Sequence, residues 1–288
     1  MTAEEHGRRL RITHRTGLRY AGPVHASFNE VRMTPNDGDG QVLLSHRLDV
    51  TPSAGVTSYV DYWGAFVEAF DVHEEHRVLE VVSTSTVEVT RAPVLAGSAS
   101  WEDLADPAVR DRWCEYLDPT GYVDDAAADP DRVETVRMLR ALPTPRVAVA
   151  AAVAVVRERM TYTPGVTTVS TTAHEAWNSG HGVCQDFSHA TLSLLRAVGV
   201  PSRYVSGYLH TEEPAVGSSV HGESHAWVEC WTGGWEAHDP TNDRYVGVGH
   251  VVVARGRDYG DVPPLKGIYN GERSEELGVS VEILQLPS

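Results

Sequence analysis

A cysteine at the start of an expected helix is the strongest candidate for a reactive residue in this sequence. Cys184 follows Gly180 and Gly182, which allow a sharp turn, and it opens a stretch with apolar residues at helical spacing. The unpaired N–H groups and positive dipole end of a first helical turn favour a thiolate, the nucleophilic form of cysteine. On this stretch alone, a small buried side chain explains Cys184 equally well.

Two later stretches supply a base and a group to orient it. Residues 223–231 alternate and are rich in aromatic and β-branched side chains, which predicts a strand that carries His225. A turn at Gly233-Gly234 and a second short strand over residues 235–241 are expected to bring Asp239 beside His225. His225 would then accept the thiol proton of Cys184, and Asp239 would fix the tautomer of the imidazole.

The sequence around these three residues resembles the transglutaminase-like superfamily, in the bacterial branch with its own N-terminal domain. The resemblance spans roughly residues 140–270 and implies a papain-like fold, a catalytic triad of Cys184, His225 and Asp239, and acyl transfer through a thioester. No calcium motif of the animal transglutaminases is visible, so we expect no metal and no cofactor. The matching blocks, in this order, are Gly182-Val183-Cys184-Gln185-Asp186, His225-Ala226-Trp227-Val228-Glu229 and Asp239-Pro240-Thr241-Asn242.

An oxyanion intermediate needs hydrogen-bond donors, and the backbone N–H of Cys184 is the first candidate because of its helix position. The superfamily often supplies a side-chain donor from the segment before the cysteine helix. Tyr162 and Trp177 are therefore candidates, although either ring could equally pack in the core. On the cysteine helix itself, Asp186 suits a helix N-terminus without any catalytic role, and we interpret His189 as structural.

Our preferred function is cysteine-dependent acyl transfer at an amide, on a protein or peptide substrate or on a small amide and amine. One alternative is a cysteine peptidase or amidase that hydrolyses a peptide or isopeptide bond. Another is a non-catalytic binding protein on the same fold. A zinc hydrolase has little support, because the histidines of 73–76 and of 174–178 lack the spacing and the further ligand of a zinc site. No substrate-binding residues and no oligomeric state are predicted.

Composition narrows the class of protein. The chain has 288 residues and a formal net charge of −16, which argues against nucleic acid and anionic membranes as partners. Residues 1–9 contain no apolar signal core, and no stretch approaches the ~18 apolar residues that span a bilayer. Three cysteines do not make a disulfide framework, so a cytoplasmic location is expected. Cys114, in an expected helix, and Cys230 are interpreted as packing residues.

Hydrophobic periodicity predicts an α+β protein in three parts. Residues 1–95 form an antiparallel, sandwich-like β domain, residues 96–160 a helical lead-in, and residues 161–288 the transglutaminase-like core with a returning final strand at 279–286. A linker is expected near 92–101, a mobile acidic loop at 121–131, and a loop beside the site at 211–222. The N-terminal domain either recruits substrate or braces the core. The expected strands are 9–16, 24–34, 41–50, 57–69, 77–90, 200–209, 223–231, 235–239 and 249–254, and the expected helices are 105–117, 130–142, 146–160, 172–177 and 184–198.

Overall fold

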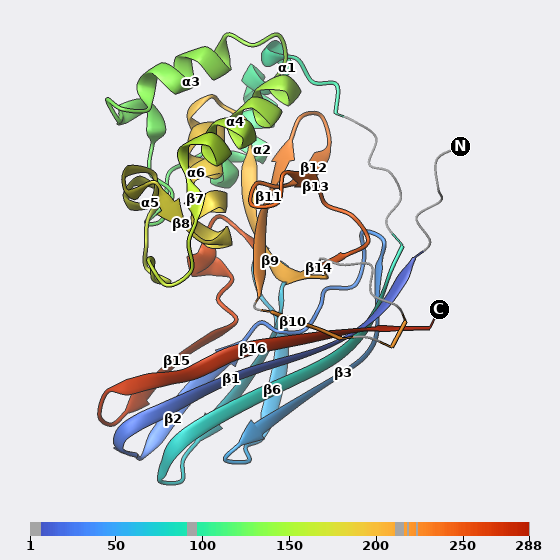
Figure 1. The fold of residues 1–288 in the computed structure, drawn as a ribbon, viewed down its shortest axis with the longest axis vertical. Helices are drawn as coiled ribbons and strands as arrows, with labels where there is room; N and C mark the ends of the chain where they lie inside the picture. Colours follow the sequence, from blue (N-terminus) through green and yellow to red (C-terminus); the bar gives the residue numbers. More distant parts are fainter. Residues whose placement is uncertain (1–6, 91–96, 211–215, 218, 223, 288) are drawn as a thin grey trace.

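The computed structural model describes residues 7–90, 97–210, 216–217, 219–222 and 224–287. Its helices lie together in the upper half of Figure 1, over a small sheet, and its longest strands make up the lower half. This separation of helices from antiparallel strands confirms the predicted α+β class. No helix in these ranges has the length and apolar character needed to cross a bilayer.

Two antiparallel sheets form the lower half. In the first, β1 (Arg8–Val24) lies beside β6 (His76–Val89), which pairs with β3 (Gln41–Thr51). In the second, β2 (Ala26–Val31) and β4 (Val56–Val60) flank β5 (Phe66–Val72). The strands enclose one buried cluster, as a sandwich-like domain requires. Its members are Tyr20, Val24, Val31, Met33, Phe70, Val72, Leu79 and Val81.

The predicted strand at 57–69 is wrong, because a turn divides it into β4 and β5. The side chain of Asp61 explains the turn: its Oδ1 accepts hydrogen bonds from the backbone N–H groups of Trp63 and Ala65, at 3.0 and 2.9 Å. Such side-chain bonds to nearby backbone compete with a strand ladder.

Strands from the end of the chain complete both lower sheets. β16 (Ser274–Leu286) runs antiparallel to β1, with Arg9 opposite Leu286, and β10 (Ser219–Gly222) pairs with β16. β15 (Leu265–Asn270) pairs with β2 (Figure 1). The predicted final strand therefore exists, begins at Ser274 and belongs to the N-terminal sheets. The loop predicted at 211–222 is wrong over residues 219–222, which form the strand β10. Residues 211–215 and 218 lie outside the described residues.

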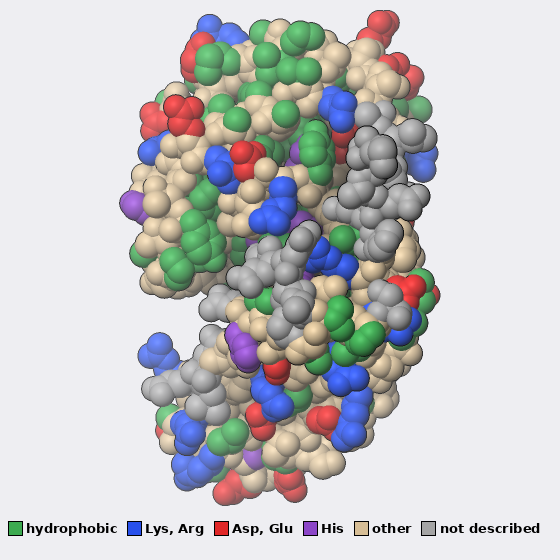
Figure 2. Space-filling model, turned by 45° about the vertical axis from the view of Figure 1, so that its right-hand side comes forward, with side chains coloured by type: hydrophobic (Ala, Val, Ile, Leu, Met, Phe, Trp, Pro, Cys, Tyr) green, Lys and Arg blue, Asp and Glu red, His purple; other side chains and the backbone are tan. Residues whose placement is uncertain are grey.

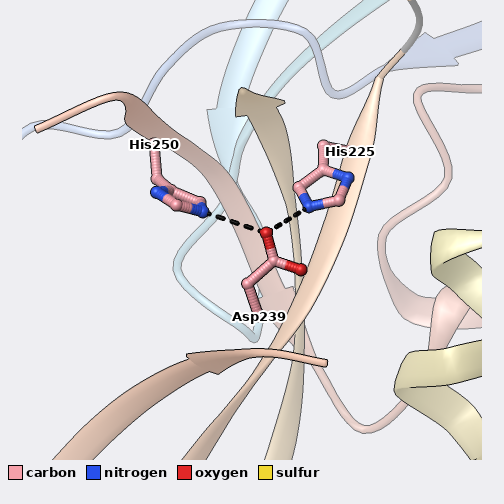
Figure 3. A group of neighbouring side chains, drawn as sticks. All are labelled: His225, Asp239 and His250. Atoms are coloured by element: carbon pink, nitrogen blue, oxygen red, sulfur yellow. Dashed lines mark hydrogen bonds and ion pairs between the residues drawn. The ribbon is translucent and has the colours of Figure 1, made fainter. Parts of the chain in front are cut away.

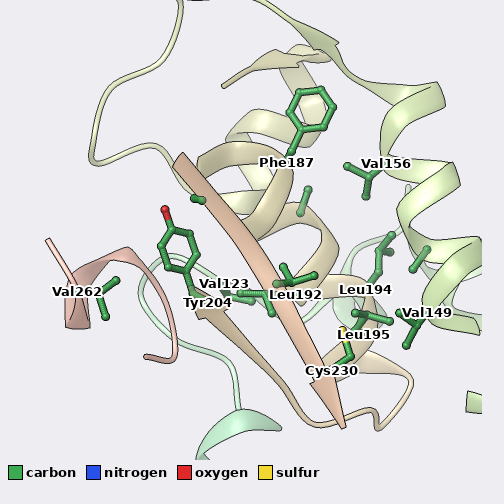
Figure 4. Close-up of a cluster of buried hydrophobic side chains, with 14 of the residues drawn as sticks. Val123, Val149, Val156, Phe187, Leu192, Leu194, Leu195, Tyr204, Cys230 and Val262 are labelled. Carbon is green, nitrogen blue, oxygen red and sulfur yellow. The ribbon is translucent and has the colours of Figure 1, made fainter. Parts of the chain in front are cut away.

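The upper half is a helical layer on a sheet in the order β13-β12-β11-β9-β14. α6 (Cys184–Ala197) is buried among α4, α5, β9 and β11, and its apolar side chains make the centre of the main hydrophobic cluster (Figure 4). Cys230 is fully buried in this cluster, as predicted. The bounds are α3 Val133–Arg140, α4 Pro145–Arg159, α5 Ala173–Ser179, β9 Ser202–Leu209, β11 His225–Trp231, β12 Trp235–Asp239, β13 Arg244–Tyr245, β14 His250–Gly256 and η3 Tyr259–Asp261.

The single helix expected at 105–117 is three short ones: α1 (Trp101–Ala105), α2 (Pro107–Arg112) and the 3₁₀ turn η1 (Cys114–Tyr116). Pro107 cannot continue α1, and the carboxylate of Asp106 instead caps α2 through the N–H of Ala108. Cys114 is exposed, so its interpretation as a packing residue is wrong. The expected linker at 92–101 falls partly on residues 91–96, which lie outside the described residues.

The acidic stretch 121–131, expected to be a mobile loop, is anchored to the core instead. Val123 and Ala126 are fully buried, the latter in the 3₁₀ turn η2 (Ala126–Ala128). The guanidinium of Arg132 is also fully buried, and it donates hydrogen bonds to the carboxylates of Asp124 and Asp129. A buried Arg holds its carboxylates in fixed geometry, so the acidic composition of this stretch reflects pairing rather than exposure.

The two halves share one hydrophobic core. Leu10 and Ile12 of β1 and Ile283 of β16 belong to the same buried cluster as the α6 side chains. The amide of Gln41 also donates to the carbonyl of Val252 and accepts from its N–H, both at 2.9 Å. The N-terminal sheets are therefore packed against β9 and β14 as part of the core.

Candidate active site

Two glycines shape the approach to Cys184, the first residue of α6. Gly180 ends α5 in the left-handed conformation, with φ of 69°, where glycine is least strained. The chain then forms the short strand β8 (His181–Gly182), which runs parallel to β7 (Thr161–Tyr162). A Cβ atom on Gly182 would lie 2.5 Å from the Cβ of Asp186, so a side chain does not fit there. The predicted sharp turn before the cysteine helix is thus present.

Asp186 and His189 have structural surroundings. The Oδ2 atom of Asp186 accepts from the N–H of Val183 at 2.8 Å and from the hydroxyl of Thr167 at 2.7 Å, which fixes the start of α6. Burial raises the pKa of Asp186. His189 is fully buried, accepts a hydrogen bond at Nε2 from the N–H of Tyr259, and has its pKa lowered to about 3 by burial. A neutral, buried His189 agrees with the predicted structural role.

His225 and Asp239 meet as the sequence predicts, on the paired strands β11 and β12. The Nε2 atom of His225 lies 2.8 Å from Oδ2 of Asp239, whose carboxylate is fully buried. Cys184 lines the same cavity as His225 and interacts with its imidazole, and its Sγ atom lies 4.0 Å from the carbonyl oxygen of Ser224, the residue before His225. Because Nε2 is taken by Asp239, Nδ1 is the nitrogen that remains for proton exchange with the thiol. The structure brings all three predicted residues together.

A second histidine, His250 at the start of β14, also contacts Asp239 and was not predicted. Figure 3 shows both imidazoles directed at the same carboxylate oxygen, with Nε2 of His250 3.2 Å from Oδ2. The Nδ1 atom of His250 accepts from the N–H of Gly247 at 3.2 Å, so its proton is on Nε2 and is donated to Asp239. The position of a histidine beside the apolar stretch 251–253 indicates that its side chain could be buried. Nothing in the sequence indicates that it contacts Asp239.

Asp239 is the most heavily hydrogen-bonded group of the site. Besides the two histidines, it accepts from the backbone N–H groups of Thr241 and Asn242, both at 3.1 Å, and from the Asn242 amide at 2.8 Å. Burial alone would raise its pKa, but these donors hold the pKa of Asp239 well below its usual range. The carboxylate is therefore ionised at neutral pH.

The charge of Asp239 acts on His225. Burial alone would lower the pKa of His225, but its hydrogen bonds to Asp239 and to Cys184 raise the pKa to about 10. The site thus favours a protonated imidazole between two acceptors. That is the arrangement in which a thiol gives its proton to histidine and the imidazolium remains beside the sulfur.

Among the residues that the structure describes, two groups of side chains have atoms close enough to share a cation: His225, Asp239 and His250, and Asp124, Asp129 and His174. In the first, both Nε2 protons already point at Asp239, so a cation would have to displace them. In the second, the guanidinium of Arg132 occupies the space between the carboxylates. We therefore assign the first group to the positioning of His225 and the second to the structure of the 121–131 segment.

The two oxyanion candidates have different positions. Tyr162, on β7, is half exposed and lines the same cavity as Cys184 and His225. Trp177, on α5, is 5% exposed, belongs to the main hydrophobic cluster and has the guanidinium of Arg159 over its ring. Trp177 does not line the cavity, so it packs in the core. Of these two side chains, Tyr162 stays a candidate donor, beside the backbone N–H of Cys184.

The cavity at Cys184 has a volume of about 780 Å³. Its lining comes from α6, β9 and β11 of the upper half and from β1, β2, β15 and β16 of the lower half. A volume of this size is typical of sites for small molecules or short peptide segments. The nucleophile candidate therefore faces a space that both halves of the molecule enclose.

Comparisons with known proteins identify the two halves separately. Residues 10–88 match the model of the bacterial transglutaminase-like N-terminal region, and residues 135–240 match that of the transglutaminase-like superfamily. An uncharacterised protein of Mycobacterium leprae is 43% identical over 280 residues, covering 96% of this chain and 99% of its own. A protein-glutamine gamma-glutamyltransferase of Pseudomonas aeruginosa is 42% identical over 65 residues, covering 21% of this chain and 10% of its own.

The fold also has a solved counterpart. The crystal structure of a proposed cysteine protease from Cytophaga hutchinsonii superimposes with a TM-score of 0.75 and 20% identity, over 99% of this chain and 92% of that chain. It shares the arrangement of N-terminal sheets and core. The two family models, with this shared fold, show that the chain belongs to the transglutaminase-like superfamily, as an enzyme of the acyltransferase or peptidase type.

Proposed function

We propose that the protein transfers acyl groups from amides through a thioester on Cys184. The observation that carries this proposal is the placement of Cys184 in one cavity with His225, which is hydrogen-bonded to Asp239 and favoured in its protonated form. That arrangement is what a nucleophilic cysteine needs and what a packing cysteine does not. The local similarity to a protein-glutamine gamma-glutamyltransferase supports the choice of an amide as acyl donor.

In the proposed reaction, the Cys184 sulfur attacks the carbonyl carbon of the amide, and the C–N bond breaks as His225 gives its proton to the leaving amine. The acyl group is then held as a thioester. An incoming amine attacks this thioester, His225 takes the proton of the attacking nitrogen, and the C–S bond breaks to release the new amide. Hydrogen-bond donors for the oxyanion come from the N–H of Cys184 and from Tyr162, each worth roughly 3 kcal/mol of barrier reduction.

Asp239 and His250 act through His225 in this scheme. Asp239 orients the imidazole and stabilises its charge, and His250 holds the carboxylate from the other side. Because His250 donates its only ring proton to Asp239, it adds a hydrogen bond without adding a charge. Both are positioning residues.

The first test compares three thiols within one molecule. Iodoacetamide is added at neutral pH, and the modification of Cys184, exposed Cys114 and buried Cys230 is followed by peptide mass spectrometry. We expect Cys184 to react roughly tenfold or more faster than Cys114, and His225→Gln to remove this advantage. Cys114 is the matched control, because its rate should be the same in both proteins. Equal rates at Cys184 and Cys114 in the wild type would instead favour the binding-protein alternative.

The second test addresses the reaction. A glutamine-containing peptide and a fluorescent primary amine are incubated with the protein, and amine incorporation and ammonia release are measured together. Incorporation that is lost in Cys184→Ala supports acyl transfer. Ammonia release without incorporation would show that water accepts the acyl group, which is the amidase alternative.

A further inference from the structure

One wall of the active-site cavity is built by strands of the N-terminal sheets. Alternate residues of β1 line it, namely His14, Thr16, Leu18 and Tyr20, and β15 contributes Leu265 and Gly267 with the same spacing. Alternate residues of a strand point to the same side of a sheet. One face of each strand is therefore turned toward the cavity that contains Cys184.

This wall is fixed relative to Cys184. The Nδ1 atom of His14 lies 3.0 Å from the hydroxyl of Tyr208 on β9, and the hydroxyl of Tyr208 donates to the carbonyl of Met33. Together with the pairing of Gln41 and Val252, these buried bonds join the N-terminal sheets to the edge of the catalytic sheet. Buried hydrogen bonds between packed elements define a single geometry. The wall is therefore a fixed part of the site.

Apart from Cys184 and His225 themselves, the described lining carries no charged side chain. Among the described residues that form it, none is Asp, Glu, Lys or Arg, although these types make up 22% of the chain. Burial lowers the pKa of His14 to about 4 and raises the pKa of Tyr20, so both are neutral at pH 7. Acidic and basic side chains are plentiful on the outer surface in Figure 2, in both halves of the view. The neutral lining thus contrasts with the surface around it.

The wall still offers polar contacts, all of them neutral. Asn29 on β2 carries an amide, and Thr16 on β1 a hydroxyl. The hydroxyl of Tyr20 is buried and has no hydrogen-bond partner among the described residues. A buried hydroxyl without a partner is costly unless a bound molecule or water supplies one. Such groups recognise amides and hydroxyls, and they leave a carboxylate or an ammonium group without a counter-charge.

We propose that the N-terminal sheets form the specificity wall of the site and select an uncharged, amide- or hydroxyl-bearing acyl donor next to the reacting carbonyl. This inference rests on the proposed function, because it takes Cys184 as the nucleophile. A cavity of about 780 Å³ has room for more than a single small side chain, so the wall contacts groups that flank the reacting amide. Charged groups nearby would lose hydration without gaining a partner.

The test uses methanethiosulfonate reagents that differ in charge: a neutral methyl, an anionic sulfonatoethyl and a cationic trimethylammonioethyl compound. Rates at Cys184 are divided by the rates at exposed Cys114 in the same molecule. We expect the neutral reagent to be favoured over both charged reagents by roughly tenfold. Equal relative rates for the three reagents, or a preference of the wild type for one charge, would overturn the proposal.

Two matched variants assign the effect to the wall. Asn29→Asp places a carboxylate in the lining, whereas Asn270→Asp makes the same change on an exposed position of β15 outside it. The first should shift the ratio of cationic to anionic rates at Cys184 upward by roughly fivefold or more, and the second should leave it unchanged. If the two variants behave alike, the N-terminal wall does not face Cys184.

The experiment distinguishes a failure of the specificity wall from a failure of the proposed function. If His225→Gln leaves the rate of the neutral reagent at Cys184 unchanged, the activated thiol fails while the charge selectivity can still hold. If His225→Gln slows the neutral reagent but charge makes no difference, the nucleophile stands and the specificity wall is refuted.

Discussion

Asp239→Asn keeps the shape of the side chain and removes its charge, and it should lower both stability and Cys184 reactivity. Asp239 accepts five hydrogen bonds, three at Oδ2 and two at Oδ1. Asparagine has only one oxygen, and its NH₂ group cannot accept. Whichever way the amide is turned, its NH₂ must face either the two backbone N–H groups or the three side-chain donors.

The less damaging orientation loses the two backbone bonds and leaves two partly buried donors unsatisfied. Each such loss costs roughly 1–3 kcal/mol. We therefore expect the free energy of unfolding at pH 7 to fall by about 3 kcal/mol, a large part of the 5–15 kcal/mol typical of a folded domain. His225 also loses its anionic partner, so alkylation of Cys184 should slow together with the loss of stability.

The assay is urea unfolding followed by tryptophan fluorescence, with Asp106→Asn as the matched control. Asp106 caps α2 through one hydrogen bond to Ala108, and asparagine caps helices equally well. The control should therefore change the unfolding free energy by less than about 0.5 kcal/mol. If Asp239→Asn stays within the same margin, the five hydrogen bonds cannot have the importance we give them.

Three further predictions follow from buried contacts. A folded-state pKa of about 10 for His225 means that its stabilising charge is fully present below pH 6.5 and is lost as pH rises through 10. The difference in unfolding free energy between the wild type and His225→Gln, measured by urea unfolding, should therefore shrink from pH 6.5 to 9.5. A difference that grows with pH would contradict this. Arg132→Met breaks buried ion pairs and should lower the free energy of unfolding, measured by thermal unfolding, by roughly 3–5 kcal/mol. The same change at exposed Arg137 should lower it by under about 1 kcal/mol, and equal losses would argue against the buried network. Gly182→Ala brings a Cβ within 2.5 Å of Asp186, so it should displace the start of α6 and slow Cys184 alkylation in the mass-spectrometric assay, and an unchanged rate would show that the helix start adapts.

The chemistry of the site could be predicted because it depends on short local patterns. Glycines before a helix, an alternating strand and a tight turn place Cys184, His225 and Asp239 with few alternatives. The contact of His250 with Asp239 could not be found this way. It requires β14 to pair with β9, with a bulge between Val252 and Ala254, and no local pattern encodes that register.

The sheets of the N-terminal half show the same limit on a larger scale. Periodicity identifies a strand near the end of the chain, but it does not say that β16 pairs with β1 or that β15 pairs with β2. Local side-chain effects also mislead, since Asp61 creates a turn inside an apparently continuous strand. Cys114 lies in the separate 3₁₀ turn η1 and not in one continuous helix, so the helical pattern does not predict its exposure.

The pairing of β1 with β16 also has a consequence for how the protein is made. β1 is synthesised before the other strands of its sheet, and its partner β16 follows about 250 residues later, which at ~5–20 residues per second means ~10–50 s. Until then one edge of β1 is unpaired, and such edges attract other strands. Its alternating Arg side chains at positions 9, 11, 15 and 19 discourage that pairing during the wait. The sheet that contains β1 is thus completed only after β16 has been synthesised.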